Sequence, residues 1–65
     1  MIEQQLEKMI KEYYELYPYG HSKMDAYNEY SKGRVMWDQM ISFNNQHFDS
    51  YSLFEQLQIK YWSTL

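Results

Sequence analysis

Two histidines are the side chains in this sequence best suited to metal binding or acid–base chemistry. His21 lies four residues before Asp25, near the expected start of a helix, and this spacing could hold a metal ion. His47 and Asp49 lie together in an expected loop. Protein metal sites usually need three or four ligands, and neither pair belongs to a known metal-binding pattern. We therefore interpret both histidines as ordinary loop residues and expect no metal site and no cofactor.

Other residues that could support catalysis also lack the required pattern. The sequence has no serine in a nucleophile elbow and no glycine-rich phosphate-binding loop. The carboxylate pair Glu12 and Glu15 stands where the solvated face of a helix would put it. A chain of 65 residues leaves little protein to line a catalytic pocket of several hundred cubic ångströms. The sequence therefore predicts that this protein is not an enzyme.

Arg34 lies between two aromatic residues, Tyr30 four positions before it and Trp37 three positions after it. In a helix this spacing would let the guanidinium stack on aromatic rings, as in some proteins that bind single-stranded nucleic acid. The net charge is −3, however, and residues 1–30 carry six acidic side chains against three lysines. Phosphate binding needs a basic surface. We expect a structural cation–π contact at Arg34 and no direct binding of nucleic acid.

Tyrosine is unusually frequent, with eight in the chain and four of them between positions 13 and 19. In an expected helix, Tyr13 and Tyr17 fall on the apolar stripe, so we expect them to be mostly buried with their hydroxyls at its edge. Tyr14 projects about 100° away from the centre of that stripe. Tyr19 lies in a turn. We therefore expect Tyr14 and Tyr19 to be exposed.

The C-terminal segment has a second set of apolar side chains that helical phase leaves outside the core. If Leu57 and Tyr61 face the core, Ile59 and Trp62 must point away from it. An exposed tryptophan beside an isoleucine indicates a binding surface, unless the segment is buried on both sides. The predicted partner-binding residues are these two, the exposed tyrosines and their acidic neighbours: Tyr14, Tyr19, Glu12, Glu15, Ile59 and Trp62.

Three helices are the elements expected to position these side chains. The first is expected over residues 2–17, because its apolar residues recur with the 3.6-residue period of a helix. It ends before Pro18, since the residue preceding a proline disfavours the helical conformation. Its apolar stripe consists of Ile2, Leu6, Met9, Ile10, Tyr13, Leu16 and Tyr17.

The second helix is expected over residues 23–44, after a capping box formed by Ser22 and Asp25. Gly33 lies inside this pattern, where glycine costs about 1 kcal/mol relative to alanine. The apolar stripe keeps its phase across Gly33, which favours one long helix with a close approach of another helix at this position. The alternative is a short helix that ends at Gly33 and a new helix directly after it.

The third helix is expected over residues 53–64, with Ser52 and Glu55 as its capping box. Its core-facing residues are Leu53, Phe54, Leu57, Tyr61 and Leu65. Near residues 34–43 and 57–65, apolar residues also recur at every second position, a pattern that would give a two-stranded element instead. The sequence predicts an all-α fold, a small three-helix bundle. The alternative is an α+β fold of helices with that two-stranded element.

The composition indicates one small domain over residues 1–65. Cysteine is absent, which excludes disulfides and thiolate zinc sites and fits a reducing cytoplasm. No stretch approaches the ~18 apolar residues of a membrane span, and no signal peptide is recognisable, so we expect a cytoplasmic protein. The many Tyr and Met residues are typical of interfaces, but an AT-rich genome would produce the same bias.

These features favour a small protein-binding module that modulates or inhibits a partner protein in the cytoplasm. Its size and composition are typical of small proteins from phages or mobile elements of low-GC bacteria. One alternative is a structural subunit that completes its core by self-assembly. Another is an acidic mimic of nucleic acid that acts on a DNA-binding host protein, although a net charge of −3 with interspersed lysines is thin support for mimicry.

Overall fold

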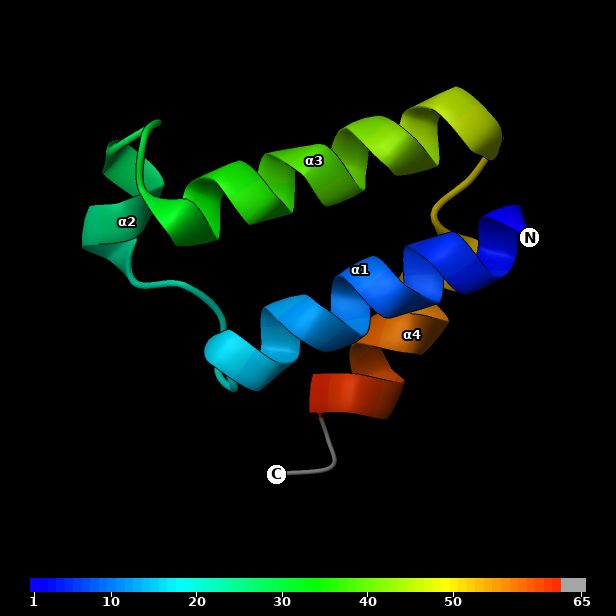
Figure 1. The fold of residues 1–65 in the computed structure, drawn as a ribbon, viewed down its shortest axis with the longest axis horizontal. Helices are drawn as coiled ribbons and strands as arrows, with labels where there is room; N and C mark the ends of the chain where they lie inside the picture. Colours follow the sequence, from blue (N-terminus) through cyan, green and yellow to red (C-terminus); the bar gives the residue numbers. More distant parts are fainter. Residues whose placement is uncertain (63–65) are drawn as a thin grey trace.

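The computed structural model describes residues 1–62, and this part of the chain forms four α-helices and no strand (Figure 1). In chain order the helices are α1 (Ile2–Leu16), α2 (Lys23–Tyr27), α3 (Lys32–His47) and α4 (Ser52–Trp62). The predicted all-α fold is confirmed. The alternative with strands is wrong for the described residues, because 34–43 lie in α3 and 57–62 lie in α4. The predicted third helix and its core residue Leu65 extend into residues 63–65, which lie outside the described residues.

Helix α1 is at the centre of the arrangement. It packs against both α3 and α4, while α2 packs against the beginning of α3 (Figure 1). The buried apolar side chains lie where the three longer helices meet: Leu6, Ile10, Tyr13, Tyr14, Met40, Phe54 and Leu57. Within residues 1–62, no helix is both long enough and apolar enough to cross a membrane.

Helix α1 forms as the sequence predicts, because its apolar side chains recur with the helical period and those in its middle are covered by neighbouring helices. Ile2 and Leu16, at its two ends, are exposed. Leu6, Ile10 and Tyr13 are fully buried. The N–H of Tyr17 still bonds to the carbonyl oxygen of Tyr13 at 2.9 Å, and the chain then turns. Gly20 closes this turn with a φ of 85°, in the left-handed region that favours glycine, and its N–H bonds to the carbonyl oxygen of Tyr17 at 2.9 Å.

The prediction of one continuous helix over residues 23–44 is wrong, since α2 and α3 are separate helices. The side chain of Asn28 accepts the N–H of Tyr30 at 3.0 Å, a local bond that competes with helical hydrogen bonding. Ser31 then caps α3 by accepting the N–H of Arg34 at 3.4 Å. The helix therefore breaks at two residues that favour turns and caps, although the apolar period continues through them.

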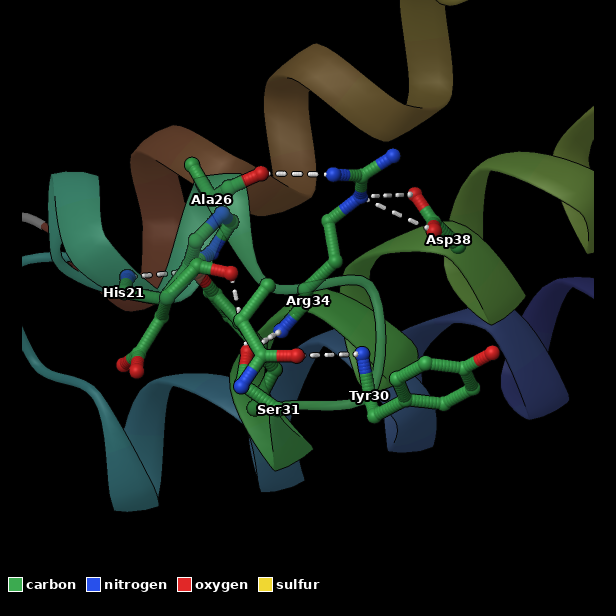
Figure 2. Close-up of polar contacts among 9 residues, drawn as sticks. His21, Ala26, Tyr30, Ser31, Arg34 and Asp38 are labelled. Carbon is green, nitrogen blue, oxygen red and sulfur yellow. Dashed lines mark hydrogen bonds and ion pairs between the residues drawn. The ribbon is translucent and has the colours of Figure 1, made fainter.

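The short helix α2 is held against α3 by Arg34. Its Nη1 donates to the carbonyl oxygen of Ala26 at 2.6 Å, and its Nε pairs with Asp38 at 3.0 Å. Figure 2 shows the guanidinium between these two oxygen acceptors and the ring of Tyr30 pointing away from it. The guanidinium is thus used to hold two helices together through oxygen atoms, and not in the cation–π contact expected from the sequence.

Gly33 lies in the first turn of α3, where the segment that joins α1 to α2 passes directly against the helix. A Cβ atom on Gly33 would lie 2.6 Å from Cβ of His21 and 3.2 Å from Cζ of Tyr17. Both distances are shorter than ordinary van der Waals contact between carbon atoms. The predicted close approach at Gly33 is confirmed, but the approaching element is a connecting segment and not another helix.

The connection from α3 to α4 is anchored by Asn44, a buried side chain whose Nδ2 donates to the carbonyl oxygen of Ser50 at 3.2 Å. Helix α4 begins at Ser52, one residue earlier than predicted. The N–H of Glu55 bonds to the carbonyl oxygen of Tyr51 at 2.8 Å, and Ser52 Oγ pairs with the hydroxyl of Ser50. The expected capping box is therefore not formed, and Ser52 is part of the helix.

Candidate functional site

An aromatic groove of about 430 Å³ lies between α4 and the C-terminal end of α1, with the turn after α1 at its edge. We term it the α1–α4 groove, and its lining consists of Tyr14, Tyr19, Gly20, Glu55, Gln58, Ile59 and Trp62. In Figure 1 the end of α4 lies beside the turn that follows α1. The lining comes from two segments far apart in the sequence, so the groove exists only in the folded chain.

Helix α4 supplies one complete side of the groove. Its four lining residues follow the spacing i, i+3, i+4 and i+7, which places them on a single helix face: Glu55, Gln58, Ile59 and Trp62. Phe54 and Leu57 are buried on the face toward α1 and α3. Ile59 is 65% exposed and Trp62 is 53% exposed, as the sequence predicts. The helix thus has one apolar face in the core and a second face at the groove that carries both apolar and polar side chains.

Tyr14 forms the floor of the groove, and the prediction that it is exposed is wrong. It is only 8% exposed, because α4 covers the side of α1 from which it projects. Its ring meets that of Tyr13 edge to face, with centroids 4.9 Å apart. Its hydroxyl accepts a hydrogen bond from Nε2 of Gln58 at 3.2 Å. Two helices pack on α1, so its buried face is wider than the single stripe used for the prediction.

Tyr19 forms the opposite edge of the groove and is 83% exposed, as predicted. It lies in the turn after α1, directly before Gly20. Gly20 adopts a positive φ, and His21 directly after it packs against Gly33 of α3. The sequence signal for this exposure was the turn itself, since a side chain in a turn has no helix to cover it.

Helix α4 is fixed to α1 by a polar cluster on the other side of the helix from the groove. Glu7 Oε2 accepts hydrogen bonds from Lys60 Nζ at 2.8 Å and from the hydroxyl of Tyr61 at 2.5 Å. The contact with Lys60, and then that with Tyr61, holds the pKa of the Glu7 carboxyl below its ordinary value. The same hydrogen bonds to Glu7 raise the pKa values of Lys60 and Tyr61. This cluster sets the position of the groove face of α4.

The fold brings the two predicted groups of partner-binding residues together at one place. Tyr14, Tyr19, Ile59 and Trp62 all line the α1–α4 groove. Their acidic companions Glu12 and Glu15 do not line it, although both are exposed on α1; Glu12 lines a separate hollow of about 60 Å³. Whether any of these residues binds a partner stays a prediction.

Besides Gly20, two lining residues on α4 were missed by the sequence reasoning, Glu55 and Gln58. The signal that would have found them is their helical phase, because both share a face with Ile59 and Trp62. Glu55 was instead interpreted as half of a capping box. Glu55 is the one charged residue of the groove lining, so it is the charged side chain most relevant to binding there.

A second hollow of about 480 Å³ lies on the surface between α1 and α3. Its lining residues are Met9, Val35, Asp38, Gln39, Ser42, Phe43 and Gln46. It is somewhat larger than the α1–α4 groove, but polar amides and a hydroxyl make up much of its lining, and its one ring, Phe43, packs against His47 with centroids 4.4 Å apart. We therefore regard the α1–α4 groove, with its exposed aromatic side chains, as the better candidate site.

The α1–α4 groove offers aromatic surface, one amide and one carboxylate, a set of groups suited to binding. Within residues 1–62, no group of three or more His, Asp or Glu side chains gathers in a way that could hold a metal ion. His21 is hydrogen-bonded to the hydroxyl of Tyr13 at 2.6 Å through Nδ1.

Comparisons of this chain with protein-family models, with curated proteins and with solved structures found no match.

Proposed function

We propose that this protein is a protein-binding module whose α1–α4 groove receives a side chain or short segment of a partner protein. The observation that supports the proposal is the shared position of Trp62, Ile59 and Tyr19, three exposed apolar side chains around one concave surface. Exposed apolar residues scattered singly need no explanation, but a group of them around a hollow is typical of a binding site. In the cytoplasm, such a module would modulate or inhibit the partner whose surface it covers.

The groove also has the energetic features of an interface centre. Binding energy in protein interfaces is concentrated in a few aromatic anchors, with tryptophan and tyrosine over-represented. Trp62 offers the largest apolar side chain of the lining, and Tyr14 beneath it is fixed by Gln58 and by the ring of Tyr13. A rigid floor reduces the conformational entropy that binding has to overcome. We therefore expect Trp62 to be the principal anchor.

The test compares Trp62→Ala with wild type and with Tyr27→Ala, which removes a more exposed aromatic residue outside the groove. Each protein is immobilised and incubated with cell lysate, and the retained protein is identified and purified. We expect wild type and Tyr27→Ala to retain the same partner. By calorimetry, Trp62→Ala should weaken its binding by at least ~2 kcal/mol, and Tyr19→Ala should weaken it less.

Circular dichroism of the same variants is the control. Trp62→Ala should remain folded, because the side chain is half exposed. If it unfolds, Trp62 belongs to the core and the loss of binding says nothing about the groove. If Trp62→Ala stays folded and retains the partner with full affinity, the groove is not the binding surface.

A second candidate function is self-assembly, which an exposed corner around α2 favours. Met24, Tyr27 and Tyr30 are all strongly exposed there. A chain that carries both a projecting apolar corner and an apolar groove has the complementary surfaces of a head-to-tail assembly. Light scattering distinguishes the two functions, because self-assembly would raise the mean mass with concentration and Tyr27→Ala would abolish the increase. A monomer at all concentrations would exclude it.

A further inference from the structure

We propose that the α1–α4 groove is selective for a cationic side chain, so that the partner segment presents a lysine, a methylated lysine or an arginine to it. The inference rests on the proposed function and specifies the chemistry of that same site. Three features support it: the aromatic rings of the groove, its single carboxylate and the net negative charge of the chain.

The first feature is the aromatic lining. Tyr19 and Trp62 are exposed on different edges of the groove, one from the turn after α1 and the other from α4. The faces of aromatic rings carry negative electrostatic potential, and tryptophan attracts a cation more strongly than the other aromatic side chains. Sites lined by several such rings bind ammonium groups, including fully methylated ones. An apolar ligand would also fit these rings, so the charged lining residue decides between the two.

The second feature is the carboxylate of Glu55. Within residues 1–62, this side chain forms no ion pair, and no lysine or arginine lines the groove. The nearest lysine along α4, Lys60, is paired with Glu7. A carboxylate within an aromatic groove favours a cation over a neutral group of the same shape, because it adds a charge-assisted hydrogen bond to the attraction of the rings.

The third feature is the net charge of the chain, which is −3. Residues 1–30 carry six acidic side chains against three lysines. A net negative charge raises the local concentration of positively charged partners and speeds their association. The net charge of the chain and the carboxylate in the groove lining therefore both favour a basic segment over an acidic one.

The experiment uses the full chain and two small probes. One is acetylated trimethyl-lysine methylamide, and the other is its neutral isostere, in which carbon replaces the ammonium nitrogen. Heteronuclear NMR follows the indole N–H signals of Trp62 and of Trp37, which is packed between Tyr13 and Phe54 and serves as an internal control. We expect the cationic probe to shift the signal of Trp62 only, and to bind at least about threefold more tightly than the isostere.

Variants identify the groups responsible. Glu55→Gln should reduce the preference for the cation by about threefold and weaken its dependence on salt. Trp62→Ala should abolish binding of the probe, and Ile2→Ala, which removes an exposed apolar side chain outside the groove, should leave it unchanged. Equal affinity for both probes would overturn the inference, as would the absence of any shift at Trp62. If Trp62→Ala still loses the partner from lysate in that case, the proposed function stands and only the cation selectivity fails.

Discussion

Two aromatic clusters on α1 differ in that one is closed and the other is open. At the junction of α1, α3 and the segment before α2, Tyr13 lies between His21 and Trp37, with ring centroids 6.0 and 5.5 Å away. Its hydroxyl lies 2.6 Å from Nδ1 of His21 and accepts the backbone N–H of His21 at 2.8 Å. In the α1–α4 groove, by contrast, Tyr19 and Trp62 present their rings to solvent.

The difference shows that residue type alone does not distinguish a core from a binding surface. Tyrosine and tryptophan occur at both places. At the junction, Gly33 lets the connecting segment approach closely, and the hydroxyl of Tyr13 finds its partners inside the chain. At the groove, α4 turns one face outward and nothing within residues 1–62 covers the ring of Tyr19. The closed cluster satisfies its polar groups within the chain, whereas the open one keeps aromatic surface in contact with solvent.

The largest effect on stability is expected when the tyrosine hydroxyl is removed at the closed cluster, and almost none when one is removed at the groove. Tyr13→Phe leaves the N–H and Nδ1 of His21 without their internal partner and should destabilise the protein by about 1–3 kcal/mol. Tyr19→Phe removes the same atom from an exposed side chain and should change stability by less than ~0.5 kcal/mol. Urea denaturation of both variants measures the contrast. Equal effects would show that the two places do not differ in the way described.

A smaller effect is expected from filling the space at Gly33. Gly33→Ala gains about 1 kcal/mol of helix propensity but places a Cβ atom 2.6 Å from Cβ of His21. Since overpacking typically costs about 1–3 kcal/mol, we expect a net loss of up to about 2 kcal/mol. His21→Gly removes the opposing atom, so the cost of Gly33→Ala should shrink in that background. A stabilising Gly33→Ala would contradict the close approach.

The smallest effect is expected from pH, through the cluster that positions α4. The pKa of Glu7 lies below its ordinary value of 4.5 when the chain is folded, so its contribution to stability is present above pH 4.5 and is lost as the pH falls through the lowered pKa. Tyr61 and Lys60 have raised pKa values, so their contributions are present below pH 10 and are lost as the pH rises further. The unfolding temperature, measured across this pH range, should fall less steeply at acidic pH for Glu7→Gln than for wild type. An equally steep fall in both proteins would show that the Glu7 cluster contributes nothing to stability.

The helical class and the first helix could be predicted from the sequence because they depend on local rules. The apolar period of α1 and the proline after it set its bounds to within one residue. The cap at Ser22 forms as expected, with its side chain accepting the N–H of Asp25 at 3.1 Å. The break before α3 was missed for a different reason. The side chains of Asn28 and Ser31 accept backbone N–H groups that a continuous helix would use, and the apolar period of the sequence carries no information on these local hydrogen bonds.

The groove itself could be predicted only in part. The exposure of Tyr19, Ile59 and Trp62 followed from turn position and helical phase, which are local properties. The burial of Tyr14 and the meeting of the two groups did not follow, because both depend on where α4 crosses α1. That crossing is set by contacts such as Gln58 with Tyr14 and Lys60 with Glu7, which join opposite parts of the chain.

These contacts also have a consequence for the order of folding. The bond between Glu7 and Lys60 joins residues 53 positions apart, and that between Tyr14 and Gln58 joins residues 44 apart. Closing such long loops costs more chain entropy than forming local structure, so contacts of this range are expected late in the folding reaction. The α1–α4 groove is therefore completed in the last step. A partner that binds it recognises the finished fold, and a peptide copied from α1 or from α4 alone would not replace it.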